Sequence, residues 1–179
     1  MDDAPFRGTA VLDLDGTLVK LDIDWDAVRR RVMACFPRAG CGSLANAIAA
    51  ISRDGAGARE ALARLLIEFE QPNGRVKFKA CRDVVIWARR LDRFYVVTNN
   101  LRSTALQVIE GLGMETRCAG IVGFDDVPAS KPDPAAWKEL LKRYGPFPAP
   151  VLYVGDRDSD ELFARHAGLG FRRVECSCV

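Results

Sequence analysis

The sequence predicts an α/β fold in which a parallel sheet is covered by helices and carries a helical insertion. Short apolar segments rich in β-branched and aromatic residues alternate with segments of helical periodicity, which is typical of successive βα units. After the first apolar segment, however, about eighty residues show helical periodicity before the next strand is expected. The chain has 179 residues, of which 49% are hydrophobic, so it can bury one such core without a structural metal or disulfides.

Five strands are expected because five segments are short, mainly apolar and bounded by Gly, Pro, Asp or Asn. They are residues 9–14, 94–98, 120–124, 151–154 and 170–174. Between the later strands the apolar residues have helical spacing, which predicts helices. These helices are expected at residues 81–91, 103–112, 134–144 and 159–167.

The insertion is expected to form a separate helical unit at residues 20–79, while residues 1–19 and 80–179 form the core. Apolar residues recur at helical spacing in three stretches, the first of which contains Trp25, Val28 and Val32. Trp25 is expected in the interior of this unit, with contact to a substrate as the alternative. A second possibility for the whole segment is that its helices belong to the main core.

Composition and charge exclude several functions. The net charge is +2 and no basic segment is present, so the electrostatic signature of a nucleic-acid-binding protein is missing. Every apolar run is soon broken by a charge, and the acidic start at Asp2 and Asp3 does not fit a signal peptide. We therefore expect a cytoplasmic protein that binds neither nucleic acid nor membrane. Both a monomer and a homodimer are compatible with the sequence.

The cysteines are not expected to have a structural role. The six cysteines lack the paired spacing of a zinc site, and cytosolic thiols are usually reduced. A structural disulfide is the less favoured alternative.

Polar side chains follow the predicted strands at their carboxyl ends, where open α/β sheets bind ligands. Clustered acids repel one another unless a cation balances them, and Mg²⁺ prefers carboxylate oxygens while leaving positions open for a phosphate group. We therefore expect a magnesium site that accepts a phosphate ester. The candidate residues are Asp13, Asp15, Gly16, Thr17, Thr98, Asn99, Lys131, Asp156 and Asp160.

Asp13 and Asp15 are two residues apart at a strand end, so their side chains can point the same way. One carboxylate can attack phosphorus while the other transfers a proton to the leaving alcohol and later activates water. Asp156 is the candidate metal ligand. Asp160, one helical turn later, is expected to share the ion or to orient a water bound to it.

The phosphate oxygens are expected to meet several donors. The backbone N–H groups of Gly16 and Thr17 follow at a turn and can form a small anion-binding nest. Thr98 offers a hydroxyl group and Lys131 a positive charge. Asn99 is expected either to donate to the phosphate or to form a turn.

Four motifs occur in order: VLDLDGTL at residues 11–18, Val97-Thr98-Asn99, Lys131-Pro132-Asp133, and the segment 155–160. In these motifs the chain resembles phosphatases of the haloacid dehalogenase-like (HAD) superfamily. The resemblance implies a Rossmann-like three-layer core with a small inserted α-helical cap, as in the phosphoglycolate phosphatase-like subfamily.

The resemblance also implies roles for the site residues. Asp13 would be the nucleophile and Asp15 the general acid/base. Asp156 would bind Mg²⁺ together with Asp13 and the backbone carbonyl of Asp15, and Asp160 would be a second acid of the metal site. Thr98 and Lys131 would bind the phosphoryl group.

The expected activity is Mg²⁺-dependent hydrolysis of a small-molecule phosphomonoester, with phosphoglycolate as the first candidate. The alternatives are a phosphomutase acting on a sugar phosphate and a non-catalytic binding protein with the same fold. Relatives that cleave carbon–halogen bonds lack an acid at the position of Asp15. Relatives that cleave phosphonates use a cap lysine, whereas residues 21–76 contain eight arginines and no lysine, which leaves only Lys20.

Three charged residues near these motifs are assigned structural roles. Arg157 is expected to face solvent, and Asp158 to lie away from the site as a helix cap or first-turn acid. His166, the only histidine, is expected to be a cation at a helix C-terminus.

Overall fold

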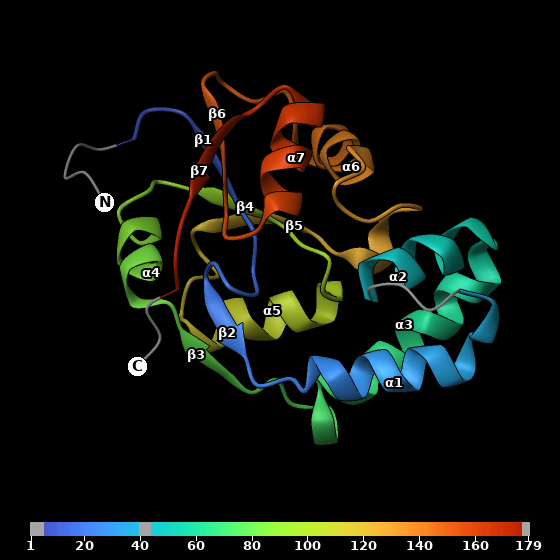
Figure 1. Cartoon of the computed structure of the whole chain (residues 1–179). Coiled ribbons are helices and arrows are strands. Elements are labelled where there is room, and N and C mark those ends of the chain that lie inside the picture. The colour runs from blue at the N-terminus through green and yellow to red at the C-terminus, as the bar shows by residue number, and fades with distance from the viewer. Residues whose placement is uncertain (1–5, 40–43, 177–179) are drawn as a thin grey trace.

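The centre of the computed structural model, which describes residues 6–39 and 44–176, is a five-stranded parallel sheet (Figure 1). The strand order is β5-β4-β1-β6-β7, and every neighbouring pair is parallel. The strands are β1 (Thr9–Leu12), β4 (Phe94–Val97), β5 (Cys118–Val122), β6 (Val151–Gly155) and β7 (Gly170–Arg173).

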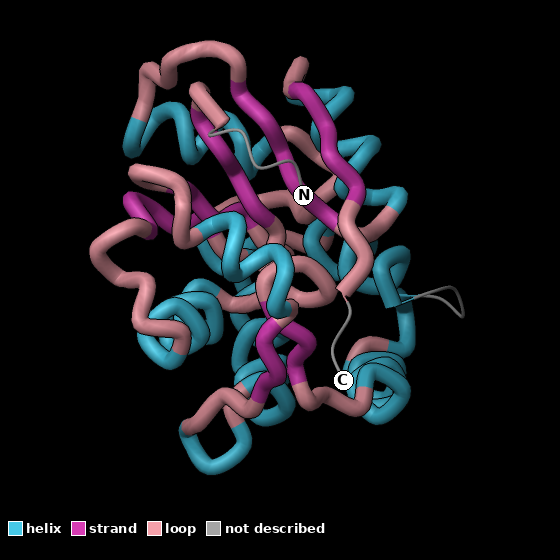
Figure 2. Tube along the Cα trace, turned by 90° about the vertical axis from the view of Figure 1, so that its left-hand side faces the viewer, coloured by secondary structure: helices cyan, strands magenta, loops and turns pink. Residues whose placement is uncertain are grey.

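Helices cover both faces of this sheet (Figure 2). Side chains alternate between the two faces of a strand, so Ala10 and Leu12 of β1 join one apolar cluster and Val11 joins another. The first cluster includes residues of α4 (Arg82–Ala88) and α5 (Arg102–Gly111). The second includes residues of α6 (Ala135–Tyr144) and α7 (Asp158–Ala167). The chain thus forms three layers, with the sheet in the middle.

A second, antiparallel pair of strands leads into and out of the helical segment. It consists of β2 (Val19–Leu21) and β3 (Phe78–Ala80). Between them lie α1 (Trp25–Cys35), α2 (Leu44–Arg53) and α3 (Ala56–Glu70), with short 3₁₀ turns η1 (Pro37–Ala39) and η2 (Pro72–Gly74). These three helices lie together to one side of the sheet (Figure 1).

The three helices share an apolar cluster with two residues of the core. Val28, Val32 and Leu62 are fully buried in it. From the core, Leu101 joins the cluster together with Phe124, the first residue of the 3₁₀ turn η3 (Phe124–Asp126). Burial of these side chains therefore stabilises the helical segment against the core.

The structure confirms the predicted α/β fold and each of the five strands, with ends that differ by a few residues. It differs at β2 and β3, which overlap the two ends of residues 20–79, where no strand was expected. Three-residue strands such as β2 and β3 are too short for a period of two to be recognised in the sequence. That residues 20–79 form a domain separate from the core stays a prediction.

The expectation that the cysteines are reduced is wrong for one pair, because Cys81 and Cys176 form a disulfide with a Cα–Cα distance of 5.1 Å. It joins the residue that follows β3 to the segment that follows β7. Cys35 and Cys118 are free thiols. Cys41 and Cys178 lie outside the described residues. In the part of the chain that the structure describes, no helix has the length and apolar character needed to cross a membrane.

Candidate active site

Three carboxylates meet at the carboxyl ends of β1 and β6. The Asp13 N–H donates to the carbonyl oxygen of Val154 at 2.9 Å, which continues the pairing of the two strands by one residue. Asp156 follows β6 directly, and Asp160 lies in the first turns of α7. One carboxylate oxygen from each of these three acids lies within 4.8 Å of the other two. The topology thus brings Asp13 next to two acids that lie more than 140 residues later in the chain.

Two glycines allow the backbone to approach these acids. Gly16 has a φ of +90°, and a Cβ atom there would lie 2.3 Å from Asp156 Oδ2. A Cβ atom at Gly155 would lie 2.5 Å from the Cβ atom of Asp160. Any larger residue at either position would displace a carboxylate, so both glycines are needed for the geometry.

Lys131 lies at the centre of the cluster. Its ammonium group donates to Asp13 Oδ1 at 2.7 Å, to Asp160 Oδ1 at 2.6 Å and to Tyr153 Oη at 2.7 Å. The lysine side chain is only 3% exposed. All three donor positions of the ammonium group are therefore used, two of them by charged partners.

The position of Lys131 is fixed from its backbone as well as from its side chain. Its N–H donates to Asn99 Oδ1 at 2.9 Å, and Asn99 Nδ2 donates to its carbonyl oxygen at 3.3 Å. In the structure Asn99 thus binds the Lys131 backbone. Tyr153, which donates to the carbonyl oxygen of Val97 at 2.9 Å, holds the ammonium group from β6.

Burial and mutual repulsion shift the pKa values of this cluster. Burial raises the pKa of Asp13 to about 7, with Lys131 opposing the shift and Asp160 adding to it. Burial also raises the pKa of Asp156, and Arg157 opposes that shift. Burial lowers the pKa of Lys131, but Asp13 and Asp160 outweigh this effect, so the pKa lies above its ordinary value. The cations of the protein therefore offset the burial of Asp13 and Asp156 only in part.

The carboxylate of Asp15 is held by two groups. Its Oδ1 atom accepts from the Leu21 N–H at 2.9 Å, and its Oδ2 atom lies 3.3 Å from the guanidinium group of Arg157. Arg157 also lies 3.6 Å from Asp156. The expectation that Arg157 faces solvent is therefore wrong in part, because this side chain is half-exposed but pairs with two acids of the site.

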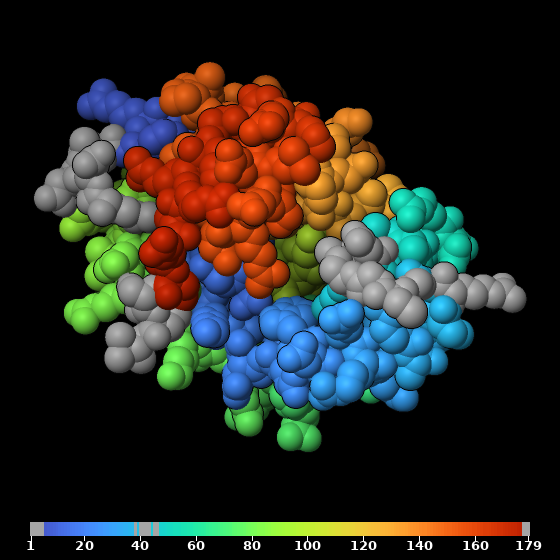
Figure 3. Space-filling view, in the orientation of Figure 1, coloured from blue at the N-terminus to red at the C-terminus, as the bar shows by residue number. Residues whose placement is uncertain are grey.

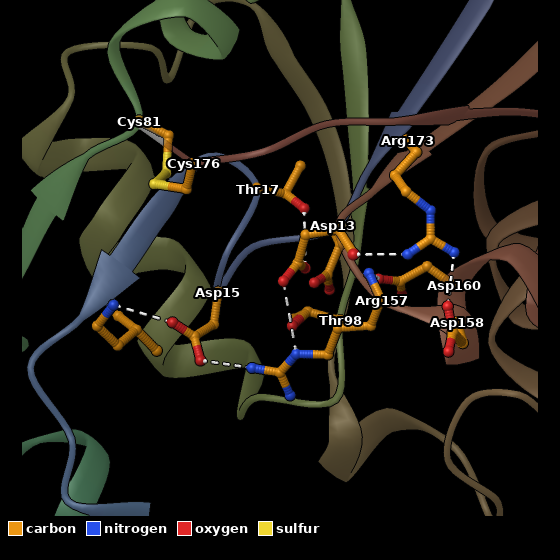
Figure 4. Close-up of polar contacts among 12 residues, drawn as sticks. Asp13, Asp15, Thr17, Cys81, Thr98, Arg157, Asp158, Asp160, Arg173 and Cys176 are labelled. Atoms are coloured by element: carbon orange, nitrogen blue, oxygen red, sulfur yellow. Dashed lines mark hydrogen bonds and ion pairs between the residues drawn. A yellow bond between two sulfur atoms is a disulfide. The ribbon is translucent and has the colours of Figure 1, made fainter. Parts of the chain in front are cut away.

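Asp158 lies apart from the three-carboxylate cluster. Its side chain is exposed and pairs with Arg173 at 2.7 Å (Figure 4). His166 is exposed in the last turn of α7, where its Nδ1 atom lies 2.9 Å from the carbonyl oxygen of Pro132. Neither residue lines the cavity that is lined by Asp13, Asp15 and Asp160.

The hydroxyl and amide groups near the acids have partners within the protein. Thr98 Oγ1 donates to Asn100 Oδ1 and accepts from the Asn100 N–H, both at 3.1 Å. Thr17 Oγ1 lies 3.4 Å from Asp156 Oδ1. The Gly16 N–H donates to Val19 and the Thr17 N–H to Leu14, so both amides of the expected nest are used within the turn.

Sequence reasoning missed Glu70, the last residue of α3, which is 2% exposed. Its Oε2 atom accepts from the Leu101 N–H at 3.0 Å, which links the helical segment to the N-terminus of α5. Burial raises the pKa of Glu70 to about 7, while hydrogen bonds from Thr104, Leu101 and Asn100 oppose the shift. A single acid at a helix end gives no signal of such a contact. Tyr153 was missed for the same reason, as one aromatic residue in an apolar strand.

A cavity of about 540 Å³ opens onto these residues. The core lines it with the acids Asp13, Asp15 and Asp160, among others, and the helical segment lines it from the other side. In Figure 3 the blue and cyan atoms of α1 and α2 face the orange and red atoms of the core across this recess. Lys20 lies elsewhere, in a separate surface pocket with Lys77 and Lys79.

Residues 8–168 match the sequence model of the haloacid dehalogenase-like hydrolases. The chain belongs to this family. A phosphoglycolate phosphatase of Xanthomonas campestris pv. campestris (strain 8004) is 28% identical over 92% of this chain and 81% of its own length. Phosphoglycolate phosphatase 1 of Pseudomonas aeruginosa is 28% identical over 89% of this chain and 66% of its own length.

Solved structures of this family share the fold. A HAD-superfamily hydrolase from Ehrlichia chaffeensis superposes with a TM-score of 0.59 at 19% identity, covering 93% of this chain and 86% of its own. The L-2-haloacid dehalogenase of Xanthobacter autotrophicus gives a TM-score of 0.56 at 18% identity, covering 93% and 76%. The fold alone therefore does not decide the reaction, which has to be argued from the site residues.

Proposed function

We propose that this chain is a Mg²⁺-dependent phosphatase that hydrolyses a small-molecule phosphomonoester through an aspartyl-phosphate intermediate. The observation that carries the proposal is the position of Asp13, which lies 2.7 Å from the Lys131 ammonium group and within the three-carboxylate cluster. A nucleophile, a cation for phosphate oxygens and a metal site are thereby combined in one cavity. Relatives named phosphoglycolate phosphatase support phosphate ester hydrolysis.

The donor set fits magnesium. Asp13, Asp156 and Asp160 offer only oxygen ligands, and the cations of the protein offset the burial of Asp13 and Asp156 only in part. The three carboxylates, with the backbone carbonyl of Asp15, would hold the ion. When bound, Mg²⁺ supplies charge neutralisation at the phosphoryl oxygens and favours the ionised form of its carboxylate ligands.

In the first step, a carboxylate oxygen of Asp13 attacks phosphorus and the bond from phosphorus to the ester oxygen breaks. The electron pair leaves with the ester oxygen, which takes a proton from the carboxyl group of Asp15. For this transfer Asp15 Oδ2 exchanges Arg157 for the leaving oxygen, while the Leu21 N–H holds Oδ1 in place. Lys131 and the Thr98 hydroxyl group each exchange an acceptor within the protein for a phosphoryl oxygen, which they then bind.

In the second step, Asp15 accepts a proton from a water molecule whose oxygen attacks phosphorus. The bond between phosphorus and Asp13 breaks, which releases phosphate and restores the carboxylate. Residues 20–79 act as a cap that limits access of bulk water to this intermediate. The Glu70 contact to Leu101 and the Arg59 contact to the Phe124 carbonyl oxygen join the cap helix α3 to the core.

The test is phosphate release from a panel of small phosphate esters, with and without Mg²⁺, by the natural chain and by Asp13→Asn. We expect release that requires both the metal and Asp13. Release that continues in the Asp13→Asn variant would contradict the proposal. Transfer of phosphate between two positions of a sugar bisphosphate without net release would instead identify a mutase.

A further inference from the structure

The two ends of the active-site cavity differ in chemistry. At the core end it is lined by acids, amides, hydroxyl groups and Lys131. At the other end, the described residues of the helical segment contribute five apolar side chains. They are Trp25 from α1, Leu44, Ile48 and Ala49 from α2, and Leu66 from α3. A substrate held by its phosphoryl group at the core end therefore places its alcohol part against this apolar wall.

The cations of the cavity are already paired at the core end. Among its described lining residues the cations are Lys131 and Arg157, both from the core. Lys131 pairs with Asp13 and Asp160, and Arg157 pairs with Asp15 and Asp156. From the described part of the helical segment, no lysine, arginine or histidine lines the cavity.

Arg59 of α3 does not supply a cation to the cavity. Its guanidinium group donates to Ser52 Oγ and to the Phe124 carbonyl oxygen, and it lies over the Phe124 ring. It therefore serves the contact between α3 and the core, and it is not among the residues that line the cavity.

Among the described residues of the helical segment, the one charged residue in the lining is Glu70, an acid. Its carboxyl group is buried and accepts the Leu101 N–H. A second anionic group on the substrate would lie in an apolar environment beside this acid and without a free cation. Burial of an unpaired charge is strongly unfavourable, and Glu70 adds repulsion when it is ionised.

We propose that this chain selects phosphomonoesters whose alcohol part is apolar and uncharged, over esters that carry a second anionic group, of which phosphoglycolate is an example. The inference rests on the phosphatase function proposed above. A cavity of about 540 Å³ has the size of an ordinary small-ligand site and accommodates a phosphoryl group with an alcohol of the size of an aromatic ring.

The first experiment compares three esters of unactivated alcohols with the full chain and Mg²⁺: benzyl phosphate, 2-phosphoglycolate and phosphoethanolamine. Their alcohol parts are apolar, anionic and cationic, respectively. We expect kcat/KM for benzyl phosphate to exceed both others by at least about tenfold, as one well-placed unfavourable charge produces. A higher kcat/KM for either charged ester would overturn the inference and leave the phosphatase function intact. Absence of Asp13-dependent release from all three would overturn both.

The second experiment introduces a cation into the apolar wall. Ala49 is an exposed helical residue that lines the cavity, so Ala49→Arg should be tolerated by the fold. We expect it to shift the kcat/KM ratio of 2-phosphoglycolate to benzyl phosphate by at least about tenfold toward 2-phosphoglycolate. The matched control is Ala61→Arg, at an exposed position of α3 away from the cavity, which should leave the ratio unchanged. An unchanged ratio in Ala49→Arg, or an equal shift in both variants, would contradict the inference.

Discussion

The carboxyl edge of the sheet and the helical wall opposite it contribute to the same cavity in different ways. The sheet edge holds each polar side chain through several short contacts, as Lys131 shows with three acceptors at 2.6–2.7 Å. The helical wall offers apolar surface and one buried acid, Glu70. The comparison indicates that bond cleavage depends on the sheet edge and that the choice of alcohol depends on the helices. Variants of the two regions should therefore have separable effects.

The largest effect is expected for Lys131→Met, which leaves Asp13 and Asp160 buried without their shared cation. We expect kcat to fall by at least about 10³-fold, because the phosphoryl group loses its cation. The free energy of unfolding without Mg²⁺ should fall by about 3–5 kcal/mol, as for removal of one partner from a buried ion pair. Urea unfolding with and without Mg²⁺ measures this loss, which added Mg²⁺ should partly restore. Equal stability of variant and natural chain without metal would show that the lysine does not stabilise these acids.

The disulfide joins the base of the helical segment to the end of the core, and its loss should affect stability but not catalysis. Cys81 and Cys176 are separated by 95 residues, so their cross-link restricts a large loop in the unfolded chain. We expect Cys176→Ser to lower the free energy of unfolding by about 2–4 kcal/mol while kcat changes by less than about twofold. Cys35→Ser, at an exposed free thiol of α1, is the control and should have little effect on either quantity. A fall in kcat under conditions where the variant is fully folded would show that the disulfide also contributes to catalysis.

Glu70 belongs to the helical wall but contacts the core, so its ionisation should make the stability of the chain depend on pH. Because burial raises its pKa from 4.5 to about 7, the folded state binds a proton more strongly than the unfolded state. Stability from this group is fully present below pH 4.5 and is lost as the pH rises toward about 7. Between pH 5 and pH 7, the free energy of unfolding of the Glu70→Gln variant should fall by about 2 kcal/mol less than that of the natural chain. Urea unfolding at the two pH values measures the difference. The same pH dependence in both proteins would show that Glu70 is not the group responsible.

The smallest effect is expected for Arg157→Gln, because its half-exposed guanidinium group is partly screened by solvent. Removal of this cation from Asp15 and Asp156 should strengthen Mg²⁺ binding by about two- to fivefold. Calorimetric titration with Mg²⁺ measures the change. Arg143→Gln, which removes ion pairs with Glu139 and Asp126 outside the cavity lining, is the matched control. Weaker Mg²⁺ binding by Arg157→Gln would indicate that the arginine orders the metal site.

The two regions also differ in how far the sequence predicts them. The strands of the sheet are apolar segments that end in polar residues, so the sequence alone places Asp13, Thr98 and Asp156 at one edge. The same local pattern could not show that Asn99 binds the Lys131 backbone, because that contact depends on how two loops 32 residues apart meet.

In the helical region the sequence predicts helices but little of what they face. The Glu70 contact to Leu101 spans 31 residues, and the pairing of β2 with β3 joins segments on either side of three helices. Periodicity reports which face of a helix is apolar, not whether that face meets a core or a cavity. Trp25, expected in the interior, both packs against the helical cluster and lines the cavity.

The most direct test of the central claim is to locate the phosphoryl group on the protein during turnover. The Asp15→Asn variant is mixed with Mg²⁺ and p-nitrophenyl phosphate, whose leaving group does not need a proton from Asp15. This variant should form the aspartyl-phosphate intermediate but hydrolyse it slowly, since the general base is missing. After acid quenching, peptide mapping by mass spectrometry should find the phosphoryl group on Asp13. A phosphoryl group on another residue, or release of p-nitrophenol without any phosphorylated peptide, would contradict the account.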